Sequence, residues 1–249
     1  MANAKKRLDA ALVEQGFFES VDQATRNVMA GLVYLNGLPS SKPGMAVGKD
    51  DLLSLAPKEK FVGRGGYKIE AALQHFGINP SGLVCLDVGA STGGFTDCLL
   101  QMGARFVYAI DVGHNQIDWR IKLDPRVSSR EGVNARFLKT DDFSPTPELA
   151  VGDVSFISLT LILPAVFRVL PLDASAVFLI KPQFELPRNE VGPGGVVIDE
   201  TARCRAVEKI QTFVEQSGHR WIGYMQSPIT GREGNIEYLC YIQITHKKD

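Results

Sequence analysis

Four ionisable residues stand where a parallel sheet would present the carboxyl ends of its strands. Asp153 closes one strand-like run, Lys181 directly follows another, and Glu237 begins the last such run of the chain. Lys68 opens a helical stretch next to a pair of glycines. Taken singly, a lysine at a strand end is more often a solvated terminus and an aspartate there is often a helix cap. Gathered on one edge, two amines and two carboxylates indicate a catalytic cluster.

A glycine-rich loop between a strand-like and a helical run is the candidate cofactor site. It reads Leu86-Asp-Val-Gly-Ala-Ser-Thr-Gly-Gly-Phe-Thr, so that Gly89, Gly93 and Gly94 let a ligand touch main chain. Asp111 ends the next strand and could bind the two hydroxyls of an adenosine ribose. The D-x-G-x-x-x-G pattern resembles that of S-adenosylmethionine methyltransferases. The alternatives are a nicotinamide dinucleotide, whose G-x-G-x-x-G fingerprint this loop lacks, and a tight turn without a ligand.

The two amines suit the removal of a proton from a weak nucleophile such as a ribose hydroxyl. A free lysine has a pKa of about 10.4, which must fall before the amine can act as a base. A second lysine and a sulfonium charge nearby would lower it, whereas the carboxylates would orient the amine and limit the shift. We expect Lys181 to be the base and Glu237 to hold that lysine. Lys68 and Asp153 would position the hydroxyl and the methyl group, and no metal is needed.

The elements that must position these residues fall into two domains. The first, residues 1–58, shows two helical stretches that end at Gly16 and Gly31, followed by a short β-ribbon with an Asn36-Gly37 turn. Ser20 and Gln23 form a capping box at the start of the second helix. Such an α+β unit has little core and suits recognition better than catalysis. A linker with three glycines, residues 59–66, joins it to a second domain, residues 67–249.

The second domain alternates strand-like and helical runs. This pattern predicts an α/β, Rossmann-like domain with a seven-stranded sheet, helices on both faces and the two closing strands at an antiparallel edge. Helices are expected at 67–76 and 199–217. The expected strands are 84–87, 106–111, 126–129, 149–153, 176–180, 221–226 and 237–245.

The bulk composition excludes several classes of protein. The chain has 249 residues, 45% of them hydrophobic and 22% charged, which is typical of a globular protein. Its apolar runs are strand-length, far short of the ~20 residues that span a bilayer, and no targeting segment is visible. The four cysteines lie far apart and suit buried thiols better than a metal or redox site. We therefore expect a cytoplasmic protein without a membrane partner or a metal.

Several segments together resemble the TlyA family. They are Phe61-Val-Gly-Arg-Gly-Gly-Tyr-Lys68, the glycine-rich loop through Asp97, Asp111-Val-Gly, Gly152-Asp-Val-Ser-Phe-Ile-Ser158, Lys181-Pro-Gln-Phe-Glu185 and Gly231 to Glu237. The N-terminal unit, from Arg7-Leu-Asp-x-x-Leu to Asn36-Gly37, looks like the RNA-binding module named after ribosomal protein S-four. The resemblance covers almost the whole chain.

The resemblance implies a function and a set of site residues. TlyA-like proteins are ribosomal RNA 2′-O-methyltransferases that act on cytidines, with S-adenosylmethionine as cofactor and ribosomal RNA or ribosomal subunits as partners. They are related to the FtsJ class, whose Lys-Asp-Lys-Glu tetrad carries over onto Lys68, Asp153, Lys181 and Glu237. Glu131 and Asn134 fall where the family places residues near the adenine. The family's cofactor loop carries over onto Asp87, Gly89, Ala90, Ser91, Gly93, Gly94 and Phe95, with Asp111 for the ribose.

Contacts with RNA are expected from two basic regions and the linker. A solvated surface is the alternative for each side chain, and the net charge of -1 does not itself favour a nucleic-acid partner. In residues 118–139, six basic residues stand against three acids and could hold the RNA backbone. The flexible glycines around Arg64 suggest a hinge. The candidate RNA-binding residues are Lys5, Lys6, Arg7, Arg26, Arg64, Arg120 and Arg136.

Two other functions compete with methyl transfer. One is a non-catalytic RNA-binding or ribosome-assembly factor, against which the intact loop and the complete tetrad argue. The other is a membrane-active haemolysin, a label that members of this family often carry. It would need a long apolar span or a basic amphipathic helix, and the sequence shows neither. The sequence leaves the modified nucleotide, the ribosomal subunit and the oligomeric state open.

Overall fold

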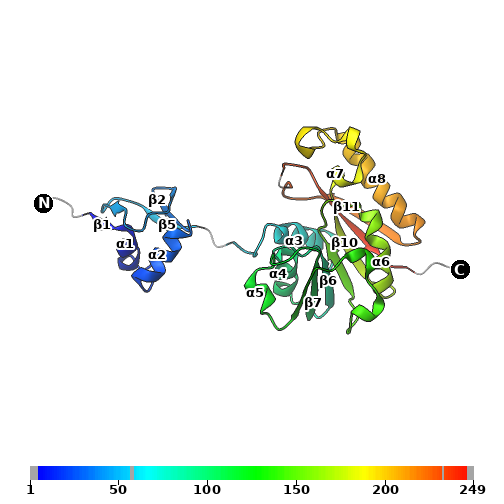
Figure 1. Cartoon of the computed structure of the whole chain (residues 1–249), viewed down its shortest axis with the longest axis horizontal. Helices are drawn as coiled ribbons and strands as arrows, with labels where there is room; N and C mark the ends of the chain where they lie inside the picture. Colours follow the sequence, from blue (N-terminus) through cyan, green and yellow to red (C-terminus); the bar gives the residue numbers. More distant parts are fainter. Residues whose placement is uncertain (1–4, 57–58, 232, 246–249) are drawn as a thin grey trace. The chain divides into compact units, whose positions relative to one another are not determined.

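The protein divides into two compact units, Met1–Glu59 and Lys60–Asp249 (Figure 1). The computed structural model describes residues 5–56, 59–231 and 233–245. Residues 57 and 58, at which the first domain is predicted to end, lie outside the described residues, as do 1–4 and 246–249 at the predicted outer limits. Within the described ranges, no helix is long and apolar enough to cross a membrane.

The first unit packs two helices against a small antiparallel sheet. Helix α1 is Leu8–Glu14 and α2 is Val21–Met29. Strands β2 (Val33–Leu35), β3 (Leu38–Ser40) and β5 (Leu53–Leu55) form a sheet of order β3-β2-β5, and β1 (Lys6–Arg7) pairs with β4 (Ala46–Val47). Half of the predicted capping box is present, because Ser20 Oγ accepts from Gln23 N at 3.2 Å. The other half is not formed as predicted, because Gln23 Oε1 accepts from Glu19 N, at 3.2 Å, instead of from the N–H of the N-cap residue Ser20. Strand β3 and the β1–β4 ribbon were not predicted from the sequence.

The second unit is built on the predicted seven-stranded sheet, in the order β11-β12-β10-β9-β6-β7-β8. Strand β12 is antiparallel to both β10 and β11, and the other neighbouring pairs are parallel. The chain's last strand is therefore inserted next to β10, with β11 outside it at the edge. The strands are β6 (Val84–Val88), β7 (Phe106–Asp111), β8 (Val127–Glu131), β9 (Leu149–Gly152), β10 (Ser175–Ile180), β11 (Arg220–Gln226) and β12 (Tyr238–Gln243).

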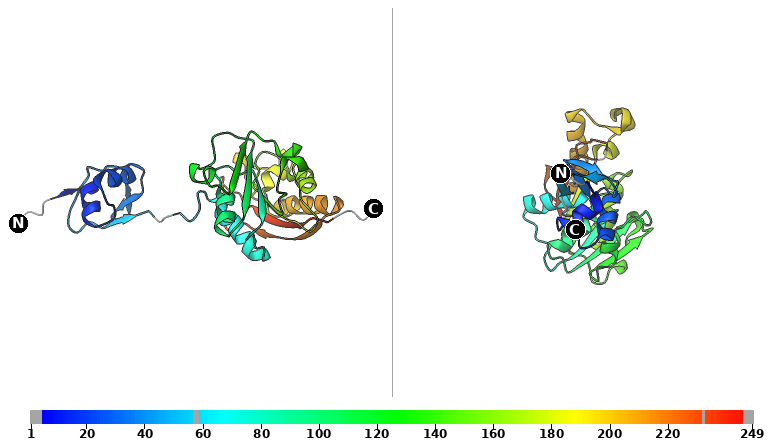
Figure 2. Two further views of the ribbon diagram at one scale, coloured as in Figure 1. Left: turned by 90° about the horizontal axis from the view of Figure 1, so that it is seen from below. Right: turned by 90° about the vertical axis from the view of Figure 1, so that its left-hand side faces the viewer.

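Helices cover both faces of this sheet (Figure 2). On one face, α3 (Gly65–Phe76) and α4 (Gly94–Gln101) pack on alternate strand residues such as Cys85 and Val107. On the other face, α6 (Leu163–Val169) and α8 (Glu200–Gln216) pack on the strand residues whose side chains point the opposite way, such as Leu86 and Tyr108. Both faces are apolar because a parallel sheet between two helical layers is buried on both sides. Two short helices, α5 (Trp119–Lys122) and α7 (Pro182–Glu185), lie in the loops.

The register of the sheet brings five chain segments to one edge. Val88 pairs with Ile110 and with Gly152, and Ile180 pairs with Tyr238. The residues just beyond β6, β7, β9 and β10 therefore meet, and the residue before β12 joins them because that strand runs the other way. This edge is where an open α/β sheet binds ligands.

Candidate active site

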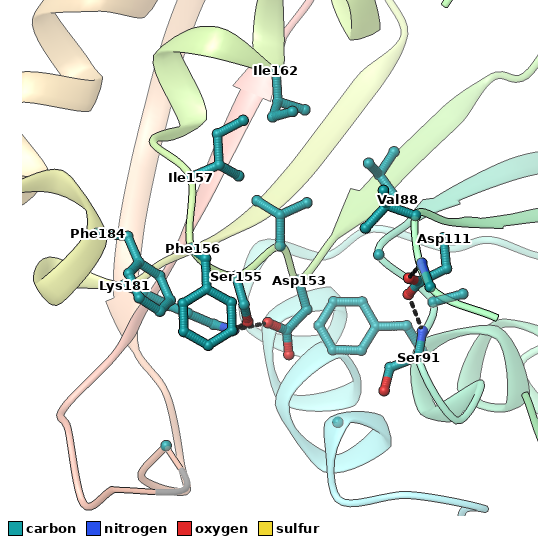
Figure 3. A pocket seen from close by; sticks show the side chains of 18 of the residues that line it. Val88, Ser91, Asp111, Asp153, Ser155, Phe156, Ile157, Ile162, Lys181 and Phe184 are labelled. Atoms are coloured by element: carbon teal, nitrogen blue, oxygen red, sulfur yellow. Dashed lines mark hydrogen bonds and ion pairs between the residues drawn. The ribbon is translucent and has the colours of Figure 1, made fainter. Parts of the chain in front are cut away.

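A pocket of about 990 Å³ opens at this edge of the sheet (Figure 3). Its walls come from α3, from the loops that follow β6, β7, β8, β9 and β10, and from the segment before β12. All four members of the predicted tetrad line it. The topology, rather than any local motif, brings together side chains that lie as far apart in the chain as Lys68 and Glu237.

The tetrad forms a chain of alternating charges. Lys68 Nζ lies 2.5 Å from Glu237 Oε2 and 3.7 Å from Asp153 Oδ2. Lys181 Nζ lies 2.6 Å from Asp153 Oδ1. The Lys68 and Glu237 side chains are almost fully buried, at 8% and 3% exposed, and Lys181 is 11% exposed. Each amine thus has a carboxylate partner, which a buried charge requires.

The partner of Glu237 differs from the one predicted. The sequence led us to expect Glu237 to hold Lys181, but Glu237 pairs with Lys68 instead. Lys181 is held by Asp153 and also donates to Ser155 Oγ at 2.7 Å (Figure 3). The reason lies in packing, since Ile69 and Leu73 of α3 belong to the same buried cluster as Leu239 of β12. This packing brings the first turn of α3 to the start of β12.

The glycine-rich loop is shaped by close contacts between backbones. Gly89 has a φ of +82°, and a Cβ added there would lie 2.7 Å from the carbonyl oxygen of Asp153. A Cβ on Gly94 would lie 3.0 Å from the carbonyl oxygen of Gly63. Only glycine fits at these two positions, so the loop can approach both the ligand and the strand that carries Asp153.

Asp111 fastens the far wall of the pocket. Its Oδ2 accepts from the backbone N–H of Ser91 and its Oδ1 accepts from that of Gly113, each at 2.7 Å. The carboxylate oxygens keep further lone pairs for donors from a ligand. Asn134 lines the same pocket and caps a 3-10 turn, with Oδ1 accepting from Arg136 N at 3.1 Å.

Most of the predicted cofactor residues line the pocket, but three do not. The lining residues are Gly89, Ala90, Ser91, Gly94, Phe95, Asp111 and Asn134. Gly93 instead faces Ile117 and Ile121, and Glu131 accepts from Gln116 N at 3.1 Å and pairs with Lys122. Asp87 is fully buried in the central strand and accepts from Thr96 Oγ1 at 2.6 Å. Burial raises the pKa of the Asp87 carboxyl to about 7. Its position suits support of the loop rather than contact with a ligand.

Two of the predicted RNA-binding arginines, Arg64 and Arg136, line the pocket and are exposed. Lys5 is exposed on the first unit. The other four already have acidic partners at distances of 2.6–3.0 Å. They are Lys6 with Glu14, Arg7 with Asp9, Arg26 with Asp22 and Arg120 with Asp118.

The sequence reasoning missed three lining residues beside Lys181. Ser155 accepts from the amine, and Phe156 and Phe184 place their rings 5.1 Å apart (Figure 3). Phe156 is 91% exposed and has a φ of +62°, which a bulky residue rarely adopts. Such a conformation persists only where the surroundings impose it. The signals in the sequence were the motifs Gly152-Asp-Val-Ser-Phe-Ile-Ser158 and Lys181-Pro-Gln-Phe-Glu185, in which only Asp153 and Lys181 are assigned a role from the sequence.

Two family models match the chain. Residues 61–243 match the FtsJ-like methyltransferase model, and residues 6–53 match the S4 domain. The chain is 42% identical over 241 residues to the 16S/23S rRNA (cytidine-2′-O)-methyltransferase TlyA of Mycobacterium tuberculosis. This match covers 96% of the chain and 90% of that protein.

Solved structures extend the comparison. A structure from Streptococcus thermophilus that bears the name hemolysin superposes with a TM-score of 0.75 at 43% identity, covering 98% of this chain and 90% of that one. An S-adenosylmethionine-dependent methyltransferase from Listeria monocytogenes has a TM-score of 0.55 at 12% identity, covering 74% of this chain and all of that one. The second likeness shows that the larger unit has the fold of these methyltransferases.

Proposed function

The chain belongs to the FtsJ-like methyltransferase family, and we propose that it transfers a methyl group from S-adenosylmethionine to a cytidine 2′-hydroxyl of ribosomal RNA. One observation carries the proposal. The Lys181 amine is nearly buried, is fixed by Asp153 and Ser155, and lies in the same pocket as the glycine-rich loop. The cytoplasm, where ribosomal subunits assemble, would be its place of action.

The residues along the β6 and β7 ends of the pocket fit S-adenosylmethionine. Asp111 offers a carboxylate to ribose hydroxyls, and apolar side chains, among them Val112 and Val133, provide a slot for a flat base. Because Gly89 and Gly94 have no side chains, the ligand can contact the main chain there. The bound cofactor would supply a methyl group on a positively charged sulfur. Asn134 would lie on the adenine side, while Ala90, Ser91 and Phe95 would complete the wall.

Lys181 would accept the proton of the ribose hydroxyl. Asp153 and Ser155 direct its amine, and a base must be held within hydrogen-bond reach of the proton that it removes. Lys68 is anchored by Glu237 and stands 3.7 Å from Asp153, so it balances the charge of that carboxylate from the other side. The tetrad thereby orients the base and the hydroxyl, and such positioning contributes a large part of the rate.

The RNA would be held outside this pocket by basic side chains. The S4 domain match supports an RNA partner for the first unit, where Lys5, Lys6, Arg7 and Arg26 are the candidates. Arg64 and Arg136 at the pocket would contact phosphates close to the target nucleotide. Arg120 would add to them by exchanging Asp118 for a phosphate.

The proposal is tested by methyl transfer from labelled S-adenosylmethionine to ribosomal subunits of a strain that lacks the gene. The label should appear on a cytidine ribose, which makes the adjacent phosphodiester resistant to alkali, and the Lys181→Ala variant should transfer it at least about a hundredfold more slowly. Label on a base, or no label in either ribosomal RNA, would overturn it. If S-adenosylmethionine fails to bind in calorimetry, a non-catalytic RNA-binding or ribosome-assembly role would replace it. The name hemolysin in a relative makes vesicle leakage a useful control assay.

A further inference from the structure

A further buried carboxylate, Glu185, stands four residues after the proposed base in the chain. Its side chain is 1% exposed, and it ends the short helix α7 that begins directly after Lys181. Its Oε1 accepts from Leu159 N at 2.7 Å, and its Oε2 accepts from Ser158 Oγ at 2.5 Å. Lys209 of α8 completes the set, with Nζ 3.0 Å from Oε2 and 2.7 Å from the Glu185 carbonyl oxygen.

The bonds of Lys181 and Glu185 connect the loop after β9 to the segment Lys181–Glu185 at both ends of the loop. The loop is residues 153–158, which follows β9. Its first part contacts Lys181 through Asp153 and Ser155, and its end contacts Glu185 through Ser158. The segment Lys181–Glu185 therefore holds the loop at both ends, and a closed ring of contacts results. Phe156 lies between the two ties, and its left-handed backbone is the conformation that a loop held in this way can impose.

We infer that Glu185 is a positioning residue, whose carboxylate clamps the 153–158 loop so that Asp153 and Ser155 hold the Lys181 amine in its reactive direction. The inference rests on the proposed function of Lys181. The Glu185–Lys209 ion pair is by itself weak grounds for stability, because the Lys209 side chain is 42% exposed and exposed ion pairs contribute little. Here the carboxylate does what an apolar side chain cannot, because it accepts from the hydroxyl of Ser158 at the end of the loop and from the backbone N–H of Leu159 directly after it.

The test compares Glu185→Ala and Glu185→Gln with a matched control, Glu190→Gln. Glu190 also pairs with an α8 side chain, Arg205, but among the described residues its side chain makes no hydrogen bond or ion pair with the loop 153–158. Glu185→Ala should lower kcat about a hundredfold, the scale of a 1 Å misplacement, with the Kd of S-adenosylmethionine unchanged. Glu185→Gln should recover part of kcat, since an amide can still accept from Leu159 N and donate to Ser158 Oγ. Ser158→Ala, a milder change, should lower kcat in the same way if Glu185→Ala does not fold.

A second measurement separates the clamp from the proposed function. Lys181 should react faster with an amine-acylating reagent in Glu185→Ala than in the unmodified protein, as mass spectrometry of the labelled peptide would reveal, and Glu190→Gln should not differ. Faster labelling in a protein that transfers no methyl group would uphold the clamp and refute the proposed function. Unchanged labelling, a kcat within threefold of the unmodified protein, or an equal loss of S-adenosylmethionine binding would each overturn the clamp.

Discussion

Lys68 and Glu237 stand 169 residues apart in the chain, yet their side chains meet at 2.5 Å in the interior of the larger unit. The pair joins the first turn of α3 to the residue before β12, and it leaves Lys68 within 3.7 Å of Asp153. Through this pair the last strand of the sheet is coupled to the acid that holds Lys181. The pair can therefore affect both stability and methyl transfer, and the two effects can be separated.

Glu237→Gln should lower the free energy of unfolding by about 3 kcal/mol, because it leaves a buried ammonium short of a partner. The double variant Lys68→Met with Glu237→Gln should regain most of that loss, since neither charge remains, but it should not regain methyl transfer. Chemical denaturation and a methyl-transfer assay on the same preparations would measure both. A double variant less stable than either single one would contradict this account of the pair.

Lys181→Ala should reduce kcat by about 10²- to 10⁴-fold, the range for loss of a general base. Calorimetry should find the affinity for S-adenosylmethionine within about threefold of the unmodified protein, because the residues that fit the cofactor lie at the β6 and β7 ends of the pocket. The melting temperature is the control for folding. If kcat stays within a few-fold, Lys181 is not the base.

The sequence predicted the sheet and the members of the tetrad, because strand periodicity locates strand ends and parallel topology brings those ends together. It did not predict which carboxylate faces which amine. That choice depends on how α3 packs against β12, through contacts such as Ile69 with Leu239 in one buried cluster. No spacing within the chain contains that information.

Two further differences have physical causes of the same kind. Asp87 looked like a ligand because it stands in the loop motif, yet the central strand that carries it is buried on both faces. The exposure of Phe156 could not be expected from the sequence, because its backbone is left-handed and its loop is bonded to the distant segment Lys181–Glu185 through Ser155 and Ser158. In each case tertiary packing, which the local pattern does not encode, decided the outcome.

Gly89→Ala should abolish most methyl transfer, whereas Gly82→Ala should leave it intact. Both glycines have positive φ, +82° and +77°, so both substitutions cost about 1 kcal/mol of backbone strain. Only at Gly89 would the new Cβ meet another backbone, 2.7 Å from the Asp153 carbonyl oxygen, with open space around Gly82. Chemical denaturation of both variants measures the loss in free energy of unfolding that they share. The difference in activity between them then reports the displacement of Asp153. Equal loss of activity in both would show that strain alone matters.

Asp87 should make the protein less stable as the pH rises. Its pKa is raised to about 7 in the folded state from an ordinary value of 3.8, because burial disfavours the charged form. Between these two pKa values the folded state binds more protons than the unfolded state. The contribution of Asp87 to the free energy of unfolding therefore falls as the pH rises towards 7, and it is constant above about pH 7. Asp87→Asn cannot titrate, so its stability relative to the unmodified protein should be greater at about pH 8 than at about pH 5. Denaturant titrations at the two pH values would measure this, and an equal difference at both would refute the assignment.

Arg136→Ala should weaken RNA binding and reduce the salt dependence of the affinity by about one unit of slope, as expected for the loss of one phosphate contact. Arg136 is exposed at the pocket, whereas Arg105 precedes β7 at the opposite edge of the sheet. Arg105→Ala removes the same charge from the same unit and is the matched control. Affinities for ribosomal RNA measured at several salt concentrations should change for Arg136→Ala alone. If both variants weaken binding equally, net charge rather than a contact at the pocket governs RNA affinity, and the RNA would have to approach the sheet from another side.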